Sequence, residues 1–230
     1  MFSANQQLAR ANASFMSRVY LWMMIGLALS GITAYTLASS PSAMMALMSH
    51  RFGVMGIIVL QIGAVLCLSA FINRMSAMLT TSVYLAYSLL SGITLSLVCI
   101  SFTGASVAEA FFITAFGFVG LSAFGLITKR DLGPLGTFCM TGLFGLIGFV
   151  LITMLFPSIR TTAVNMTINT LGLLIFAGLT AYDTQKIKSL NMSGFGGEIA
   201  HKAAISGALM LYLDFINIFL NVLNLLGNRR

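Results

Sequence analysis

Long apolar stretches recur along the whole chain, and each is close to the roughly 20 residues that a helix needs to cross a bilayer. The hydrophobic fraction of 58% also exceeds the roughly 45–50% of ordinary soluble domains. The runs are continuous and do not alternate with polar residues, which excludes a transmembrane β-barrel. The sequence therefore predicts an all-α integral membrane protein, with a cytoplasmic N-terminal segment at 1–18 and one seven-helix domain at 19–230. The seven expected spans are Val19–Ala38, Gly53–Ile72, Met78–Phe102, Val107–Thr128, Leu135–Phe156, Val164–Tyr182 and Ile199–Leu226.

The basic residues are unevenly distributed among the connections between these stretches. If the N-terminus is cytoplasmic, only Arg51 and Arg160 lie in outside loops. This bias follows the positive-inside rule, so it explains the net charge of +7 without a nucleic-acid partner. The tail pair Arg229 and Arg230 falls outside if the seventh segment crosses fully, and inside if it re-enters. The inside set is Arg10, Arg18, Arg74, Lys129, Arg130, Lys186, Lys188 and Lys202.

Residues that commonly carry catalysis or hold metals are scattered. The cysteines Cys67, Cys99 and Cys139 lie in separate apolar segments without metal-ligand spacing, and His50 and His201 are isolated. The sequence contains no Gly-rich phosphate loop, nucleophile–base constellation or redox motif. We therefore expect neither an enzyme nor a tightly bound cofactor.

Small residues predict faces on which membrane helices approach closely. Ala177 and Gly178 give the sixth stretch a surface of small side chains just before Asp183. We therefore expect a neighbouring helix to approach there and Asp183 to come within its reach. Plain bundle packing is expected at most of the other glycines. Those that recur every three residues in the fourth and fifth stretches are Gly117, Gly120, Gly142, Gly145 and Gly148.

The seventh stretch carries a polar stripe on an otherwise apolar helix. Asp214, Asn217, Asn221 and Asn224 follow spacings of three, four and three residues, which place them along one helical face. Such a stripe belongs in the centre of a bundle or along a wet path. We therefore expect six helices to surround the seventh.

The stripe contains one of only five acidic residues in the chain, and Asp183 is another. A carboxylate near the middle of a membrane helix costs roughly 2.5–3.5 kcal/mol on insertion scales, so it needs a partner, a proton or water. Asp214 lies far along its helix and must be buried. If Asp183 and Asp214 meet, both cannot ionise cheaply, and the pair is expected to share a proton.

Two cations could neutralise this pair once the shared proton leaves. Arg74, in the short turn between the second and third spans, can pair with a carboxylate. A calcium ion is the other candidate, because it favours carboxylate and carbonyl oxygens. Asp183 and Asp214 would form a weak, exchangeable site for it, and Asn217 and Asn221 could line a cation path.

Four stretches of this sequence resemble the Bax inhibitor-1 family of membrane proteins, and the hydropathy pattern is similar throughout. The likeness is greatest to the bacterial branch, with its short tails. The matching stretches are Ser91–Ser96, Thr128–Pro134, Ala181–Lys186 and Leu211–Asn217.

The resemblance implies a seven-helix fold and a pH-sensitive calcium leak in which two aspartates sense protons. Asp183 and Asp214 fall on that pair, and Arg74 falls on an arginine that latches one aspartate in the closed state. Acid would then protonate Asp183, release Arg74 and open the path. The bacterial likeness also implies location in the inner membrane, with the lipid bilayer, calcium ions and protons as partners.

Three other functions stay open at this point. A non-conducting regulator that binds other membrane proteins, such as a quality-control protease, needs no carboxylate pair. An intramembrane aspartyl protease needs two aspartates, but Leu213 precedes Asp214 where a Gly-x-Gly-Asp motif is expected. A proton-coupled transporter would be favoured by an inverted repeat or by broken helices in matching halves, and neither is visible.

Overall fold

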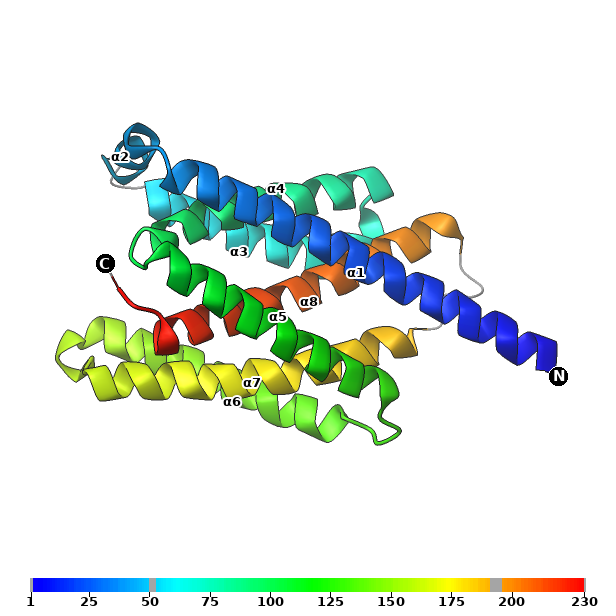
Figure 1. The fold of residues 1–230 in the computed structure, drawn as a ribbon. Helices are drawn as coiled ribbons and strands as arrows, with labels where there is room; N and C mark the ends of the chain where they lie inside the picture. Colours follow the sequence, from blue (N-terminus) through cyan, green and yellow to red (C-terminus); the bar gives the residue numbers. More distant parts are fainter. Residues whose placement is uncertain (1, 50–52, 191–195, 230) are drawn as a thin grey trace. The chain divides into compact units, whose positions relative to one another are not determined.

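The computed structural model describes residues 2–49, 53–190 and 196–229, and most of these are helical (Figure 1). Residues in the described ranges form no β-sheet, so the predicted all-α class is confirmed. His50, Arg51 and Arg230 lie outside the described residues. The α-helices are α1 (Phe2–Ala38), α2 (Pro41–Ser49), α3 (Gly53–Phe71), α4 (Ala77–Cys99), α5 (Gly104–Ile127), α6 (Gly133–Leu155), α7 (Thr162–Ser189) and α8 (Gly197–Leu226), with short 3-10 helices η1 (Ile72–Arg74) and η2 (Pro157–Ile159).

Within the described ranges, seven helical segments are long and apolar enough to span a membrane, and they correspond to the seven predicted stretches. The boundaries differ most at the N-terminus, where α1 already begins at Phe2. The sequence before Gly26 contains neither Pro nor Gly, so nothing in it breaks the helix. Helix α2 was not predicted because its nine residues are too few to cross a bilayer.

The chain divides into two compact units, and the division falls within α8, between Tyr212 and Leu213. Unit 1 comprises residues 1–102, 191–212 and 230, and so contains α1 to α4 with the first half of α8. Unit 2 comprises residues 103–190 and 213–229, and so contains α5 to α7 with the second half of α8.

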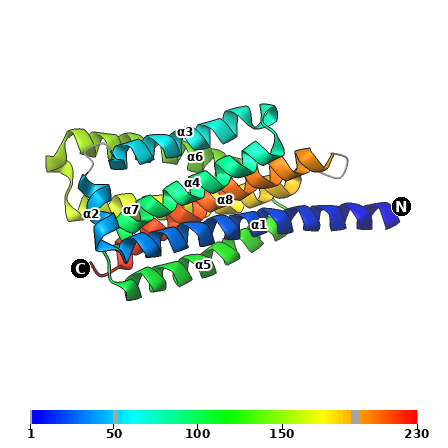
Figure 2. The ribbon, with the colours of Figure 1, turned by 90° about the horizontal axis from the view of Figure 1, so that it is seen from above.

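In unit 1, α1 packs closely on α4 (Figure 2). A Cβ atom added at Gly92 would lie only 2.5 Å from the Cβ of Thr33 and 2.7 Å from the carbonyl oxygen of Ser30. Glycine at position 92 is therefore what allows the backbones of α1 and α4 to approach. The first half of α8 joins the same unit through His201, whose Nε2 forms a hydrogen bond of 2.9 Å with the Thr81 hydroxyl.

In unit 2, α7 packs against both α5 and α6. A Cβ added at Gly125 of α5 would overlap the carbonyl oxygen of Ala181, and one added at Gly178 of α7 would lie 2.5 Å from the Cys139 sulfur. The predicted close approach at Gly178 is confirmed. Among the spaced glycines, the expected packing holds at Gly142, where an added Cβ would lie 3.3 Å from Ile175. The prediction was wrong for the other four, because an added Cβ would meet no described atom within 4 Å at Gly117, Gly120, Gly145 or Gly148.

Helix α8 is the most deeply buried of the seven spans. In an 18-residue apolar stretch of α8, 61% of the residues are buried, against 6–39% in the corresponding stretches of the other six spans. A helix with a polar stripe gains most from such burial, because lipid offers its amides and carboxylate no hydrogen bonds. The structure therefore buries the polar-striped span more than the other six.

Candidate functional site

Each asparagine of the α8 stripe uses its side-chain nitrogen for a hydrogen bond within α8. The Nδ2 groups of Asn217, Asn221 and Asn224 each donate to the backbone carbonyl four residues earlier, at 2.8 Å. Because a carbonyl can only accept, the nitrogen of each amide is the atom that points back to the helix. The stripe therefore presents amide oxygens to its surroundings, and oxygens are the groups that bind hard cations.

Asp214 lies at the start of this stripe and is buried, with 4% of its surface exposed. Its Oδ2 atom is buried without a hydrogen-bond partner among the described residues. The next residue, Phe215, fixes this part of α8 in unit 2, because its ring makes edge contacts at 5.6 Å with both Phe111 and Phe118 of α5. The buried carboxyl group is thus held in place while part of it is left unpaired.

Asp183 is half-buried near the end of α7, in the same unit as Asp214. The charge of Asp183 acts on the Asp214 carboxyl group within this unit. Asp183 also interacts electrostatically with Lys186, one helical turn further along α7. The structure therefore places in one unit the two aspartates that the sequence singled out, with a lysine one helical turn from the less buried one.

Neighbouring side chains fix the rotation of α7 around Asp183. Thr184 forms a hydroxyl–hydroxyl bond of 2.9 Å with Ser122 of α5. Gln185 accepts from the backbone N–H of Leu132 and donates to the backbone carbonyl of Arg130, both at 2.8 Å. These contacts tie the last turns of α7 to α5 and to the loop between α5 and α6.

Sequence reasoning missed Thr114, a buried residue of α5. Its side chain is 1% exposed, and its hydroxyl has no hydrogen-bond partner among the described residues. It lies between Phe111 and Phe118, the two residues that contact Phe215, and so occurs at the level of Asp214 in unit 2. A lone threonine in an apolar helix gives no sequence signal, because its hydroxyl usually bonds back to its own helix.

The sequence profile described as "Inhibitor of apoptosis-promoting Bax1" matches residues 12–230, which is nearly the whole chain. The chain belongs to the Bax inhibitor-1 family.

Bacterial members of the family resemble this chain over almost their full length. An inner membrane protein of Escherichia coli, YbhL, is 40% identical, and the match covers 94% of this chain and 92% of the relative. An uncharacterized protein of Deinococcus radiodurans is 39% identical, with 94% and 91% covered. An uncharacterized protein of Rickettsia prowazekii is 33% identical, with 99% and 95% covered.

Arg74, the predicted latch of this Bax inhibitor-1 chain, belongs to unit 1. It ends the short helix η1, and its side chain is exposed. Within unit 1, no described carboxylate forms an ion pair with it. Its role as a latch remains a prediction.

Asp183 and Asp214 supply two carboxyl groups in unit 2 as candidate ligands for a calcium ion. No group of three or more His, Cys, Asp or Glu side chains gathers as a metal site within the described ranges. Two carboxyl groups and nearby amide oxygens fit a hard cation chemically, but they provide fewer ligands than the six to eight oxygens of a tight calcium site. Such a site favours transient over resident binding.

Proposed function

We propose that this Bax inhibitor-1 family protein is a pH-sensitive calcium leak channel of the bacterial inner membrane, with its N-terminus in the cytoplasm. Protonation of the Asp183–Asp214 pair sets its conducting state. The observation that supports this proposal is a buried Asp214 carboxyl oxygen that has no hydrogen-bond partner among the described residues and that experiences the charge of Asp183 in the same unit.

The physical argument begins with the energy of the pair. Two carboxylates in a medium of low dielectric repel one another strongly, so the pair keeps a proton over a wide range of pH. Loss of that proton leaves a charge that needs a cation or a change of packing. A hydrogen ion thus controls a charge at the start of the oxygen-lined stripe of Asn217 and Asn221.

Weak coordination is what a conducting path requires. An ion must bind well enough to enter and weakly enough to leave. Asp183 and Asp214 with the amide oxygens of the stripe meet both conditions, because they supply negative charge but few ligands. The resemblance to the family implies that acid opens the path.

The test is calcium flux from vesicles that contain the purified chain, measured at about pH 6 and about pH 8, a range in which coupled buried carboxyls change charge. We expect a pH-dependent leak in the native chain and a pH-independent leak in Asp214→Asn and Asp183→Asn. Asp131→Asn is the matched control, because Asp131 is an exposed loop carboxylate that accepts from the Gly133 N–H at 2.9 Å. An unchanged pH response in Asp214→Asn would contradict gating by the pair.

The same vesicles separate the leak from the main alternative. A regulator that acts by binding other membrane proteins would give no calcium flux in vesicles that contain this chain alone. Asp183→Ala and Asp214→Ala would then be tolerated in a cellular assay of the regulated partner.

A further inference from the structure

A groove of about 250 Å³ runs along the α6–α7 face of unit 2. Gly136 and Tyr182 both line it, and the Tyr182 ring packs where a Cβ of residue 136 would be, with ring atoms 2.5–2.7 Å from that position. Further along α6, Met140 and Phe144 border the groove and are 45% and 72% exposed. The groove is therefore open to whatever surrounds these two helices.

More than half of the groove wall is apolar, although two threonines line it. The hydroxyl of Thr137 donates to the Gly133 carbonyl at 3.0 Å, and that of Thr141 donates to the Thr137 carbonyl at 2.9 Å. Both polar groups are satisfied within their own helix, so each side chain offers its methyl group to the groove. Water gains little in such a place, because it needs two to four polar partners.

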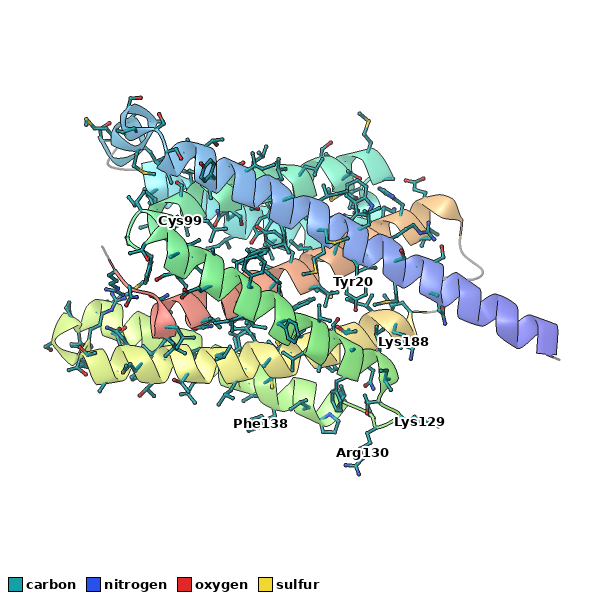
Figure 3. The ribbon with its side chains drawn as sticks, viewed as in Figure 1. Tyr20, Cys99, Lys129, Arg130, Phe138 and Lys188 are labelled. Carbon is teal, nitrogen blue, oxygen red and sulfur yellow. The ribbon has the colours of Figure 1, made fainter. Side chains whose placement is uncertain are left out.

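One end of the groove carries a positive charge. Lys186 lines the groove, is exposed, and holds its Nζ 5.7 Å from the centre of the Tyr182 ring. Lys129 and Arg130 belong to the loop that Gln185 ties to the last turns of α7, so they lie at the same end of unit 2 (Figure 3). This end is complementary in charge to an anionic headgroup.

The surroundings of the groove determine its occupant. Helices α6 and α7 are both long and apolar enough to span the membrane, so we expect an open, largely apolar groove between them to face hydrocarbon chains. A lysine near the end of a spanning helix reaches the headgroup region. We propose that the groove binds one anionic phospholipid, with an acyl chain along α6 and the phosphate on Lys186.

Lys186 also connects the groove to the aspartate pair. Its charge already attracts Asp183, and a lipid phosphate would compete for the same ammonium group. Bound lipid would thereby change how the pair is neutralised. This link rests on the proposed leak function, whereas lipid binding itself does not.

The experiment uses the full chain in detergent, with lipid binding followed by native mass spectrometry. Phosphatidylglycerol and phosphatidylcholine with identical acyl chains are the two probes. We expect phosphatidylglycerol to bind about fivefold more tightly, which corresponds to about 1 kcal/mol for one basic residue at the headgroup level. Lys186→Gln should remove this preference.

Lys188→Gln is the matched control, because it removes the same charge two residues away at a side chain that donates to the Leu126 carbonyl and does not line the groove. It should keep the preference. Equal loss in both variants, or no preference in the native chain, overturns the proposal. The first outcome would indicate a diffuse basic surface.

Thr141→Leu tests the acyl-chain part separately, because it fills the groove and leaves every charge in place. It should weaken binding of both lipids, and unchanged binding overturns the proposal. Calcium flux in phosphatidylglycerol and phosphatidylcholine vesicles then tests the link to Asp183. Lipid binding without leak would refute the proposed function and leave the lipid site intact.

Discussion

Two buried polar side chains, Tyr212 and Asp214, lie two residues apart on α8, and they differ in how well their polar atoms are hydrogen-bonded. We call Tyr212 with Ser30 and Ser88 the paired cluster. Tyr212, in unit 1, is fully buried, and its hydroxyl lies 2.7 Å from the hydroxyl of Ser30. Ser30 also lies 2.7 Å from the carbonyl of Ser88, so it can donate there and accept from Tyr212. Asp214, in unit 2, keeps a buried oxygen without any partner among the described residues.

This difference distinguishes buried polar groups that stabilise the fold from buried polar groups that destabilise it. A buried hydroxyl network with every member satisfied adds to stability and fixes one packing. A buried unpaired carboxyl group costs free energy that an apolar side chain of similar size would not. Such a group is expected where function requires it.

Replacing the unpaired carboxyl with an apolar group should have the largest effect. In Asp214→Leu, we expect the pH response of the calcium leak to disappear while the free energy of unfolding rises by about 2 kcal/mol, because a buried unsatisfied group is removed. Flux assays and thermal unfolding in detergent measure the two effects. Loss of stability in this variant would mean that Asp214 has a structural partner and that the comparison fails.

Crowding the paired cluster should have the next largest effect, and it should lower the free energy of unfolding. In Gly92→Val, the added Cβ would overlap Thr33 and the Ser30 carbonyl oxygen, so α1 and α4 must separate. We expect a loss of about 2 kcal/mol, typical of overpacking. Gly31→Val is the control, because a Cβ at Gly31 of α1 would meet no described atom within 4 Å. Equal destabilisation of both variants would argue against close α1–α4 packing.

Removing one hydroxyl from the paired cluster should cost less. Tyr212→Phe deletes the bond to Ser30 but keeps the ring, which makes edge contacts with Tyr84 and Tyr87 at 6.4 and 5.7 Å. We expect a loss of about 1 kcal/mol, within the range for hydrogen bonds between membrane helices, and an unchanged pH response. A variant that loses its pH response would show that the paired cluster and Asp214 are not independent.

Periodicity and hydropathy were sufficient to predict much of this molecule. The seven spans and the polar stripe follow from the spacing of apolar residues and asparagines, because both patterns depend only on residues within one helix. The same reasoning identified Asp183 and Asp214, since charge is so rare in this chain that each carboxylate stands out. The burial of Asp214 also followed from its position far along α8.

Most contacts between helices could not be predicted in this way. The close approach at Gly178 was predicted, but those at Gly92, Gly125 and Gly136 were not, and a Cβ added at Gly117 or Gly145 would meet no described atom within 4 Å. Which glycine faces a neighbour depends on how each helix is rotated, and that is set by side chains distant in sequence. The Tyr212–Ser30 bond joins residues 182 positions apart, and no local pattern encodes it.

The smallest expected effect on stability, and the sharpest test of the comparison, is at Thr114. Its hydroxyl, like the Asp214 Oδ2 atom, has no hydrogen-bond partner among the described residues, but it carries no charge. Thr114→Val should therefore leave the unfolding free energy the same or raise it by a few tenths of a kcal/mol. If the hydroxyl contributes to the cation path, the rate of calcium leak should fall severalfold in Thr114→Val and recover in Thr114→Ser, while its pH dependence stays. Thr180→Val is the control, because the Thr180 hydroxyl is also fully buried but donates to the Phe176 carbonyl at 2.8 Å. A normal leak rate in Thr114→Val would mean that an unpaired polar group in this bundle need not be functional, and the argument for Asp214 would then rest on its charge alone.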